Sequence, residues 1–424
     1  MSDILFVRIF DRYAGFLELA GIHRAPEDWR FEYDPSYVQS GQALALSVSL
    51  PLREEAFAGS VVRNWFGNLL PEGAIKAAIC HRLRISPDDD FAMLEAIGGE
   101  CAGAVSISSE LDYHPGQRLQ AERLQDALQE GALDGNIAEM ALAGTPWRLS
   151  LAGAQDKIAV VQDADGEIRL PASGELTTHI LKPESRRLAG LRDMEALGMR
   201  LAAAIGLPVA AASLRTVAAK KVLLVERYDR VSAPGAPAVR LHQEDFCQAL
   251  GCPSELKYES QGGPSRHSCL HLIKYMTPLG PVAIARFIDW VLYNILIGNA
   301  DAHAKNIALL TQVDGRRRLA PYYDLVPTMA FSRKSLDRAP AMRIGDALSI
   351  DALTKANWLA LVQSIESRLP YVQQRLRQMV AGIQATLPQV VAELASQGAS
   401  RDLLEHAEQV ITAQCWRAIE AVTG

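Results

Sequence analysis

Two residues five positions apart, an aspartate and an asparagine, have the side-chain types and the spacing that phosphoryl transfer requires. A carboxylate such as that of Asp301 can orient an attacking hydroxyl, and the amide oxygen of Asn306 can bind a divalent cation. Asp324 follows the strand-like sequence LAPYY and supplies a second carboxylate, the kind of oxygen ligand that magnesium prefers. The alternative is that Asp301 and Asn306 only cap the turn after Gly298.

A lysine upstream of these residues could bind the phosphates of a nucleotide. Lys182 lies in THILKP, on a predicted short strand that ends at Pro183, the position from which a strand lysine reaches the α- and β-phosphates. Before it, RLSLAGAQDKIAVV predicts a polar loop feeding a strand, and Gly153 would let the backbone approach a phosphate. The loop matches neither a Walker A motif nor the three-glycine loop of kinases, so its role stays open.

Several other polar residues have ordinary structural interpretations. We expect Glu195, on a helical segment, to be a solvated residue rather than a partner of Lys182. Three residues before FCQALG are interpreted as helix-capping groups: His242, Glu244 and Asp245. The Gly262-Gly263 pair is either a loop near the nucleotide or a flexible turn.

The predicted secondary structure around these residues changes along the chain, from strands in the first half to helices in the second. From Ile4 to about Leu52, short apolar clusters separated by turn residues predict strands. A helix is predicted between Ser86 as its cap and the Gly98-Gly99 pair. A second β-rich region includes KIAVVQD and EIRL and ends near LLVERYD.

From about His242 onward the pattern is helical. The apolar residues between Val282 and Leu296 form one broad helix face, and Gly298 ends this buried helix just before NADAHAKN. We therefore predict an α+β protein with a β-rich N-terminal accessory subdomain (1–135), a kinase-like N-lobe (136–228) and an all-helical C-lobe (229–424).

The composition is that of a soluble globular protein. Of the 424 residues, 49% are apolar and 22% charged, and the net charge of −6 argues against a protein built mainly to neutralise nucleic acid. DNA contact is expected to be indirect. Six cysteines without a CxxC pair indicate reduced thiols. The charged N-terminus and the lack of a long apolar stretch predict a cytoplasmic protein without a membrane contact.

Seven motifs in order make the sequence resemble the HipA-type kinase family: SLAGAQDK, THILKP, ERYDR, HQEDFCQALG, KYESQGGP, LIGNADAHAKN and APYYDLVPT. The N-terminal SVSLPLR, NLLPEG and IGGECAGAV resemble the accessory subdomain of the same family, so the likeness runs along most of the chain. The resemblance implies a two-lobed protein-kinase-like fold, related to that of lipid and small-molecule kinases.

The same resemblance implies an ATP- and Mg²⁺-dependent serine/threonine kinase. Asp301 would be the catalytic base, and Asn306 and Asp324 the metal ligands. Ser150 would be a site of self-inactivating autophosphorylation in an ATP-covering loop of the N-lobe. Adenine would bind backbone groups of the hinge from Glu226 to Tyr228. The expected nucleotide contacts are Gly153, Ala154, Gln155, Lys157, Lys182, Glu226, Tyr228, His303 and Lys305.

The resemblance also implies partners and leaves two alternative functions. Family members pair with a helix-turn-helix antitoxin and modify translation proteins such as aminoacyl-tRNA synthetases. Asn299-Ala300 stands where ordinary protein kinases carry His-Arg, so control by a phosphorylated activation loop is not expected. His303, which small-molecule kinases share, keeps a small-molecule substrate as an alternative, although the accessory region favours a protein. The other alternative is a catalytically silent co-repressor. The presence of all the expected catalytic and metal-binding residues argues against it.

Overall fold

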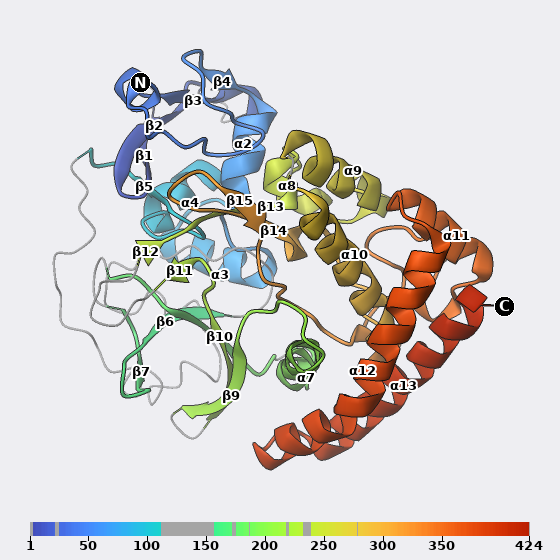
Figure 1. Ribbon diagram of the computed structural model, residues 1–424. Helices are drawn as coiled ribbons and strands as arrows, with labels where there is room; N and C mark the ends of the chain where they lie inside the picture. Colours follow the sequence, from blue (N-terminus) through green and yellow to red (C-terminus); the bar gives the residue numbers. More distant parts are fainter. Residues whose placement is uncertain are drawn as a thin grey trace.

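The computed structural model describes residues 3–21, 25–111, 157–171, 175–185, 187–217, 220–231, 239–277 and 279–423 (Figure 1). Four residues of the predicted ATP-covering loop lie outside these described residues: Ser150, Gly153, Ala154 and Gln155.

The N-terminal part of the chain folds around a five-stranded antiparallel sheet in the order β4-β3-β2-β1-β5. Along the first strand the even alternation of exposed and buried side chains places Leu5, Val7 and Ile9 in the core. The strands are β1 (Asp3–Ile9), β2 (Arg12–Leu19), β3 (Trp29–Tyr33), β4 (Phe57–Ala58) and β5 (Val105–Ser108). The helices are α1 (Pro35–Gln39), α2 (Ser60–Gly67), α3 (Gly73–Leu83) and α4 (Asp90–Ile97). We call residues 3–111 the N-terminal unit.

Helix α4 begins later than the sequence predicted. Asp89 is its cap, because the Asp89 side chain accepts a hydrogen bond from the N–H of Ala92 at 3.0 Å. Ser86 instead opens a turn in which its carbonyl accepts from the N–H of Asp89. The predicted cap at Ser86 is therefore wrong, and the helix ends at Ile97, before the predicted glycine pair.

A second five-stranded sheet follows, in the order β7-β6-β8-β10-β9. Lys182 lies on β8, which ends at Pro183 as predicted, and it pairs with Leu223 of the neighbouring β10. The strands are β6 (Ile158–Gln162), β7 (Ile168–Arg169), β8 (His179–Pro183), β9 (Ala212–Val217) and β10 (Lys220–Glu226). Helix α7 (Leu191–Ala204) packs between this sheet and the helices α12 and α13 (Figure 1).

The C-terminal part is mainly helical. It contains α8 (Phe246–Ala249), α9 (Arg266–His271), α10 (Pro281–Leu296), α11 (Lys355–Ser364), α12 (Leu369–Ser396) and α13 (Arg401–Thr423). The prediction of a buried helix that ends before Gly298 is confirmed by α10. Gly298 has φ of +71°, and a Cβ there would lie 2.8 Å from the Met329 sulfur, so only glycine fits.

The C-terminal part is not all-helical, which corrects the prediction. It carries the antiparallel sheet β13 (His242–Asp245), β14 (Ala308–Thr311) and β15 (Arg317–Leu319), as well as the hairpin β11 (Arg230–Val231) and β12 (Val239–Arg240). A run as short as ALLT cannot be told from helix by periodicity, although Asp314-Gly315 between β14 and β15 is a hairpin signal.

Of the three predicted helix caps, which all lie in β13, only one is confirmed. Asp245 does cap α8, accepting from the N–H of Gln248 at 2.9 Å. His242 and Glu244 are instead buried strand residues that contact the N-terminal unit, where Glu244 accepts a hydrogen bond from the N–H of Val48 at 3.1 Å. Within the described ranges, no helix is both long and apolar enough to cross a bilayer.

Candidate active site

A cleft of about 1280 Å³ lies where the three parts of the fold meet. Its wall includes Lys182 of the second sheet, Asp301 and Asp324 of the C-terminal part, and Asn68 and Glu72 of the N-terminal unit. The cleft is therefore lined by residues that the sequence predicted and also by residues of the N-terminal unit, which the sequence did not indicate.

Lys182 forms two ion pairs in the cleft. Its ammonium lies 2.6 Å from Glu195 Oε1 and 2.9 Å from Asp324 Oδ1. Burial disfavours the charge of Lys182, but the carboxylates of Asp324 and Glu195 outweigh this cost and raise the lysine pKa above its ordinary value. Lys182 therefore stays positively charged, as the predicted phosphate contact would require.

The expectation that Glu195 is solvated is wrong. Its side chain is 1% exposed. The reason is that α7 is covered on almost every side by the second sheet and the C-terminal helices, so even its charged residues Arg192 and Asp193 are buried. A buried carboxylate needs a partner, and Lys182 provides it.

Asp324 has an uncommon backbone conformation. Its φ of +58° lies in the left-handed region, which residues with a side chain seldom adopt outside turns and functional sites. Burial opposes the charge of the carboxylate, but Lys182 lowers the pKa of Asp324 below its ordinary value. Asp324 is thus an ionised carboxylate beside a cation, the kind of group that could act as an oxygen ligand.

Residues 299–306 carry the predicted base and are called the catalytic loop below. This loop is held by asparagine side chains. Asn299 Oδ1 accepts from the N–H of Asp301 at 3.1 Å, while Asn299 Nδ2 donates to Asn294 Oδ1 at 2.7 Å. Asn306 Nδ2 donates to the carbonyl of Asp301 at 3.1 Å. The amide nitrogen of Asn306 thus stabilises the turn and its oxygen can serve as a ligand. The exposed carboxylate of Asp301 accepts a hydrogen bond from the hydroxyl of Tyr258 at 2.8 Å.

The donor set fits a magnesium ion. The described residues contain no cluster of three or more histidine, cysteine, aspartate or glutamate side chains that could hold a metal by themselves. Magnesium bound with a nucleotide needs only one or two carboxylates, because phosphates and water supply the other oxygens. The oxygens of Asp324 and Asn306 are of that type.

Two further loop residues were predicted to contact the nucleotide. His303 lines the cleft, and burial lowers the pKa of its imidazole, so the ring is neutral at pH 7. Lys305 also lines the cleft, but its ammonium donates to Asn68 Oδ1 at 2.6 Å and lies 3.1 Å from Glu72. Lys305 therefore connects the catalytic loop to the N-terminal unit, a contact that no local sequence signal could indicate.

Lys157 is the first described residue after the covering-loop sequence, and it lines the cleft half-buried. Burial lowers the pKa of its ammonium to about 8, and the neighbouring charge of Lys182 acts in the same direction. The position is consistent with the predicted phosphate contact.

The predicted hinge begins at the last residue of β10 and lines the cleft at Glu226, Arg227 and Tyr228. The N–H of Glu226 donates to the carbonyl of Ala211, and the N–H of Arg227 to that of Thr178. An adenine would therefore bind carbonyl groups of this segment or the N–H of Tyr228.

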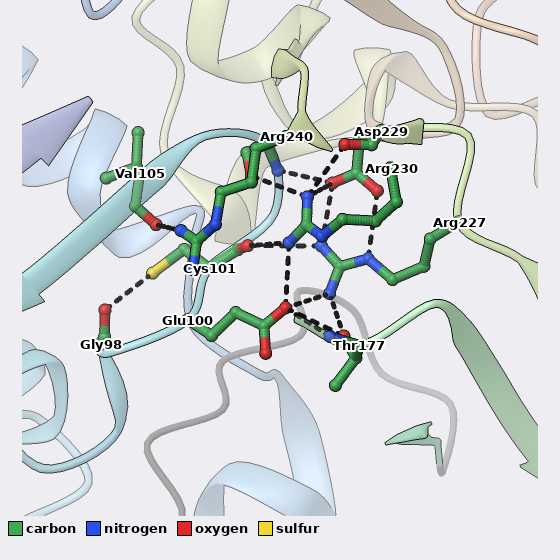
Figure 2. Close-up of polar contacts among 10 residues, drawn as sticks. Gly98, Glu100, Cys101, Val105, Thr177, Arg227, Asp229, Arg230 and Arg240 are labelled. Carbon is green, nitrogen blue, oxygen red and sulfur yellow. Dashed lines mark hydrogen bonds and ion pairs between the residues drawn. The ribbon is translucent and has the colours of Figure 1, made fainter. Parts of the chain in front are cut away.

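A buried charge network joins this hinge to the N-terminal unit (Figure 2). Arg227 donates to Asp229 Oδ2 at 2.8 Å, to Thr177 Oγ1 at 2.8 Å and to Glu100 Oε1 at 3.3 Å. Arg230 bonds the same two carboxylates, at 3.0 Å each. The sequence did not indicate this network, although its charged members stand in two of the quoted motifs, ERYDR and IGGECAGAV.

This network also uses the backbone of the N-terminal unit. Asp229 Oδ2 accepts from the N–H of Gly103 at 2.7 Å, and the carbonyl of Gly103 accepts from Arg230 at 2.9 Å. The charges of Arg227 and Arg230 outweigh the effect of burial and lower the pKa of Asp229 below its ordinary value. The N-terminal unit is therefore fixed directly to the hinge.

Together the fold and the cleft define a protein of the kinase type. A strand lysine pairs with a helix glutamate, and the facing helical part carries the Asp-x₄-Asn loop and the second aspartate. In family comparisons, the HipA-like C-terminal domain matches residues 149–390 and the HipA N-terminal domain matches residues 10–108. This chain belongs to the HipA family, as the resemblance predicted.

Individual relatives agree with this assignment. A putative kinase of Sinorhizobium fredii, Y4mE, is 38% identical over 358 residues, which cover 83% of this chain and 84% of that protein. The serine/threonine-protein kinase toxin HipA of Shewanella oneidensis is 29% identical over 404 residues, covering 91% and 89% of the two chains.

A solved structure is similar over nearly the whole length. The Shewanella oneidensis HipA in a complex with HipB and operator DNA superposes with a TM-score of 0.83 and 25% identity, covering 99% of this chain and 98% of that chain. The α+β kinase-like fold is thereby confirmed. The protein is a HipA-like kinase, and this homology implies the use of ATP.

Proposed function

We propose that this protein transfers the γ-phosphate of ATP to a serine or threonine of a protein acceptor. The observation that carries the proposal is the position of Lys182, which lies within hydrogen-bonding distance of both Glu195 and Asp324. In protein kinases a strand lysine paired with a helix glutamate marks the arrangement competent for transfer.

In the proposed mechanism each residue has a distinct task. Lys182 binds the α- and β-phosphates, while Asp324 and Asn306 would hold Mg²⁺, which would neutralise charge on the phosphates. Asp301 orients the acceptor hydroxyl and takes its proton as the oxygen attacks the γ-phosphorus. The bond between the γ-phosphorus and the oxygen that bridges it to the β-phosphate breaks, and ADP is the leaving group. Lys157, His303 and the segment from Glu226 to Tyr228 complete the nucleotide site. The units 1–135, 136–228 and 229–424 are proposed as its accessory subdomain, N-lobe and C-lobe.

We further propose that Ser150 is an autophosphorylation site that switches the kinase off. Ser150 belongs to the loop sequence that leads to Lys157. A phosphoryl group there adds about −1.5 to −2 charges at neutral pH, which would repel the triphosphate of ATP. Mass spectrometry of the purified protein should find phosphate on Ser150, and the modified protein should bind ATP more weakly. Unmodified Ser150 in an active preparation would contradict this switch.

The proposed biological role is that of a toxin. The acceptor would be a translation protein such as an aminoacyl-tRNA synthetase, and a helix-turn-helix antitoxin would neutralise the kinase and mediate contact with DNA. The complex of a relative with HipB and operator DNA supports such a partner. A cytoplasmic location follows from this role.

Two alternatives fit the site less well. A small-molecule kinase, which His303 would suit, needs an acidic pocket for an amine or a sugar. The cleft acids Glu72 and Asp245 are instead paired with Lys257 and Lys305. A catalytically silent co-repressor would not need the Lys182 to Glu195 pair.

The test is to express the wild-type protein alone and to map new phosphorylation in the cells by mass spectrometry. The proposal expects growth arrest and phosphate on serine or threonine of a small set of proteins, with neither effect for Lys182→Met. Arrest by the inactive variant would favour the co-repressor. Phosphate on metabolites alone would favour the small-molecule kinase.

A further inference from the structure

The phenol of Tyr258 lies on the carboxylate to which the proposed function assigns the base role. Its hydroxyl donates to Asp301 Oδ1 at 2.8 Å. Burial, and next the charge of Asp301, raise the pKa of Tyr258 above its ordinary value, so the phenol keeps its proton at neutral pH and remains a donor. The Tyr258 ring also meets His303 of the same loop edge-on, with ring centroids 5.6 Å apart.

A tightly packed turn holds Tyr258 in this place. The carbonyl of Tyr258 accepts from the N–H of Gly263 at 2.9 Å, and Gly262 has φ of +99°. A Cβ at Gly263 would lie 2.2 Å from the carbonyl oxygen of Leu256, so a side chain cannot be placed there. The glycine pair, for which the sequence left two interpretations, is therefore a fixed turn.

The residues on both sides of Tyr258 attach the turn to the rest of the cleft. Glu259 donates its N–H to the carbonyl of Ala341 at 2.9 Å and accepts from the N–H of Arg343 at 2.6 Å. On the other side, Lys257 lies 3.0 Å from Glu72 of the N-terminal unit. Tyr258 thus projects from a support that is fixed at both ends.

We propose that Tyr258 is a positioning residue that fixes the carboxylate of Asp301 for phosphoryl transfer, an inference that rests on the proposed function. Asp301 is exposed, and an exposed carboxylate changes rotamer easily unless a neighbour holds it. A base must be held within a fraction of an ångström of its productive position. A carboxylate offers about four acceptor sites, so one phenol leaves room for the acceptor hydroxyl.

The opposite arrangement is a gate, in which the phenol occupies the place of the acceptor hydroxyl and must leave before transfer. The two arrangements predict opposite changes in the rate of transfer when the hydroxyl is removed. Removing the Tyr258 hydroxyl slows transfer if the hydroxyl positions Asp301, and it accelerates transfer if the hydroxyl blocks Asp301.

The experiment compares Tyr258→Phe, which removes only the hydroxyl, with Tyr275→Phe at an exposed tyrosine outside the cleft. The probe is γ-phosphate-labelled ATP with the proteins of a bacterial extract as acceptors. We expect Tyr258→Phe to lower kcat by roughly 10- to 100-fold, the effect of a misplaced catalytic group. The KM for ATP, nucleotide binding and the melting temperature should stay unchanged, and Tyr275→Phe should match the wild type.

Equal or faster turnover of Tyr258→Phe overturns the proposal, as does a loss of ATP affinity or of thermal stability that parallels the loss of turnover. Hydrogen exchange of residues 299–306 gives a readout that needs no activity. It should be faster in Tyr258→Phe than in the wild type, and unchanged exchange overturns the proposal. Absence of transfer by the wild type would instead refute the proposed function, and the exchange measurement would still decide the role of Tyr258.

Discussion

Arg230 and Glu100 meet at 3.0 Å although 130 residues separate them in the sequence. Their contact joins the segment after the hinge to the N-terminal unit in a site from which water is largely excluded. Because Arg227, which lines the cleft, bonds the same carboxylate oxygen, Glu100 holds two arginines together next to the predicted hinge. The N-terminal unit is therefore a structural part of the kinase rather than an attachment to it.

Replacing Glu100 should destabilise the protein strongly. Glu100→Ala leaves Arg227 and Arg230 with one carboxylate, that of Asp229, and a buried charge that loses its partner costs roughly 3 to 5 kcal/mol. Urea unfolding measures this loss. The matched control is Glu405→Ala, which breaks an exposed pair with Arg401 and should cost less than about 0.5 kcal/mol. Similar losses for both variants would contradict the role of the network.

Replacing Glu195 should impair nucleotide use. Glu195→Gln keeps the shape of the side chain but removes the charge that pairs with Lys182 at 2.6 Å. We expect transfer to fall by roughly 10-fold or more, because one charged hydrogen bond that orients the lysine is weakened by about 1.5 to 3 kcal/mol. Steady-state kinetics at varied ATP concentrations measure the fall in transfer. Arg200→Met on the same helix breaks only an exposed pair with Glu393 and should behave as the wild type. Normal kinetics of Glu195→Gln would remove this pair from the mechanism.

Asp324→Ala should abolish the advantage that magnesium gives to ATP binding. In the wild type we expect ATP to bind more tightly with Mg²⁺ than with EDTA, since Asp324 supplies an ionised oxygen ligand. Without that ligand, affinity with Mg²⁺ should fall, while affinity in EDTA should not fall, because a negative charge near the phosphates is gone. Calorimetric titrations under both conditions measure these affinities. An unchanged magnesium effect in the variant would show that Asp324 is not a ligand.

Glu244 should make the protein less stable as the pH rises. Burial raises the pKa of this carboxyl to about 7, against 4.5 for an exposed glutamate, while hydrogen bonds from Ser47 and Val48 act in the opposite direction. The folded state therefore holds a proton that the unfolded state has lost, and this contribution is complete below pH 4.5 and disappears as the pH rises through 7. At about 1.4 kcal/mol for each pKa unit, the loss is roughly 3 kcal/mol.

Glu244→Gln tests this titration. Urea unfolding between pH 5 and 8 should show a steep loss of stability in the wild type and a smaller loss in the variant. His242, whose pKa burial lowers to about 4, changes stability in the opposite direction but is present in both proteins, so the difference isolates Glu244. Equal slopes in both proteins would mean that Glu244 titrates normally.

The sequence predicted those parts of the site whose positions depend on local motifs. Lys182 on a strand that ends at Pro183, and Asp301 in the loop after Gly298, lie where expected because strand ends and helix-ending glycines are local features. Glu195 was misjudged because its burial depends on what packs around α7, which periodicity within one helix does not reveal.

Contacts between distant segments could not be predicted at all. Nothing near Lys305 indicates that Glu72 of the N-terminal unit will lie 3.1 Å away. The same holds for Tyr258 and Asp301, whose meeting depends on how the turn at Gly263 is attached to the cleft. Such contacts are set by tertiary packing, and a single sequence carries no pattern for them.

The proposed function depends on Asp301 as the base in phosphoryl transfer. Single-turnover transfer from labelled ATP by Asp301→Asn, together with the ATP affinity of this variant, tests that role. Asparagine keeps the size of the side chain and can still accept from Tyr258, but it cannot take a proton. We predict that transfer falls by about 10²- to 10⁴-fold while the dissociation constant for ATP stays within about twofold of the wild type, since Asp301 does not bind the nucleotide. Transfer at the wild-type rate by Asp301→Asn would contradict a base role for Asp301.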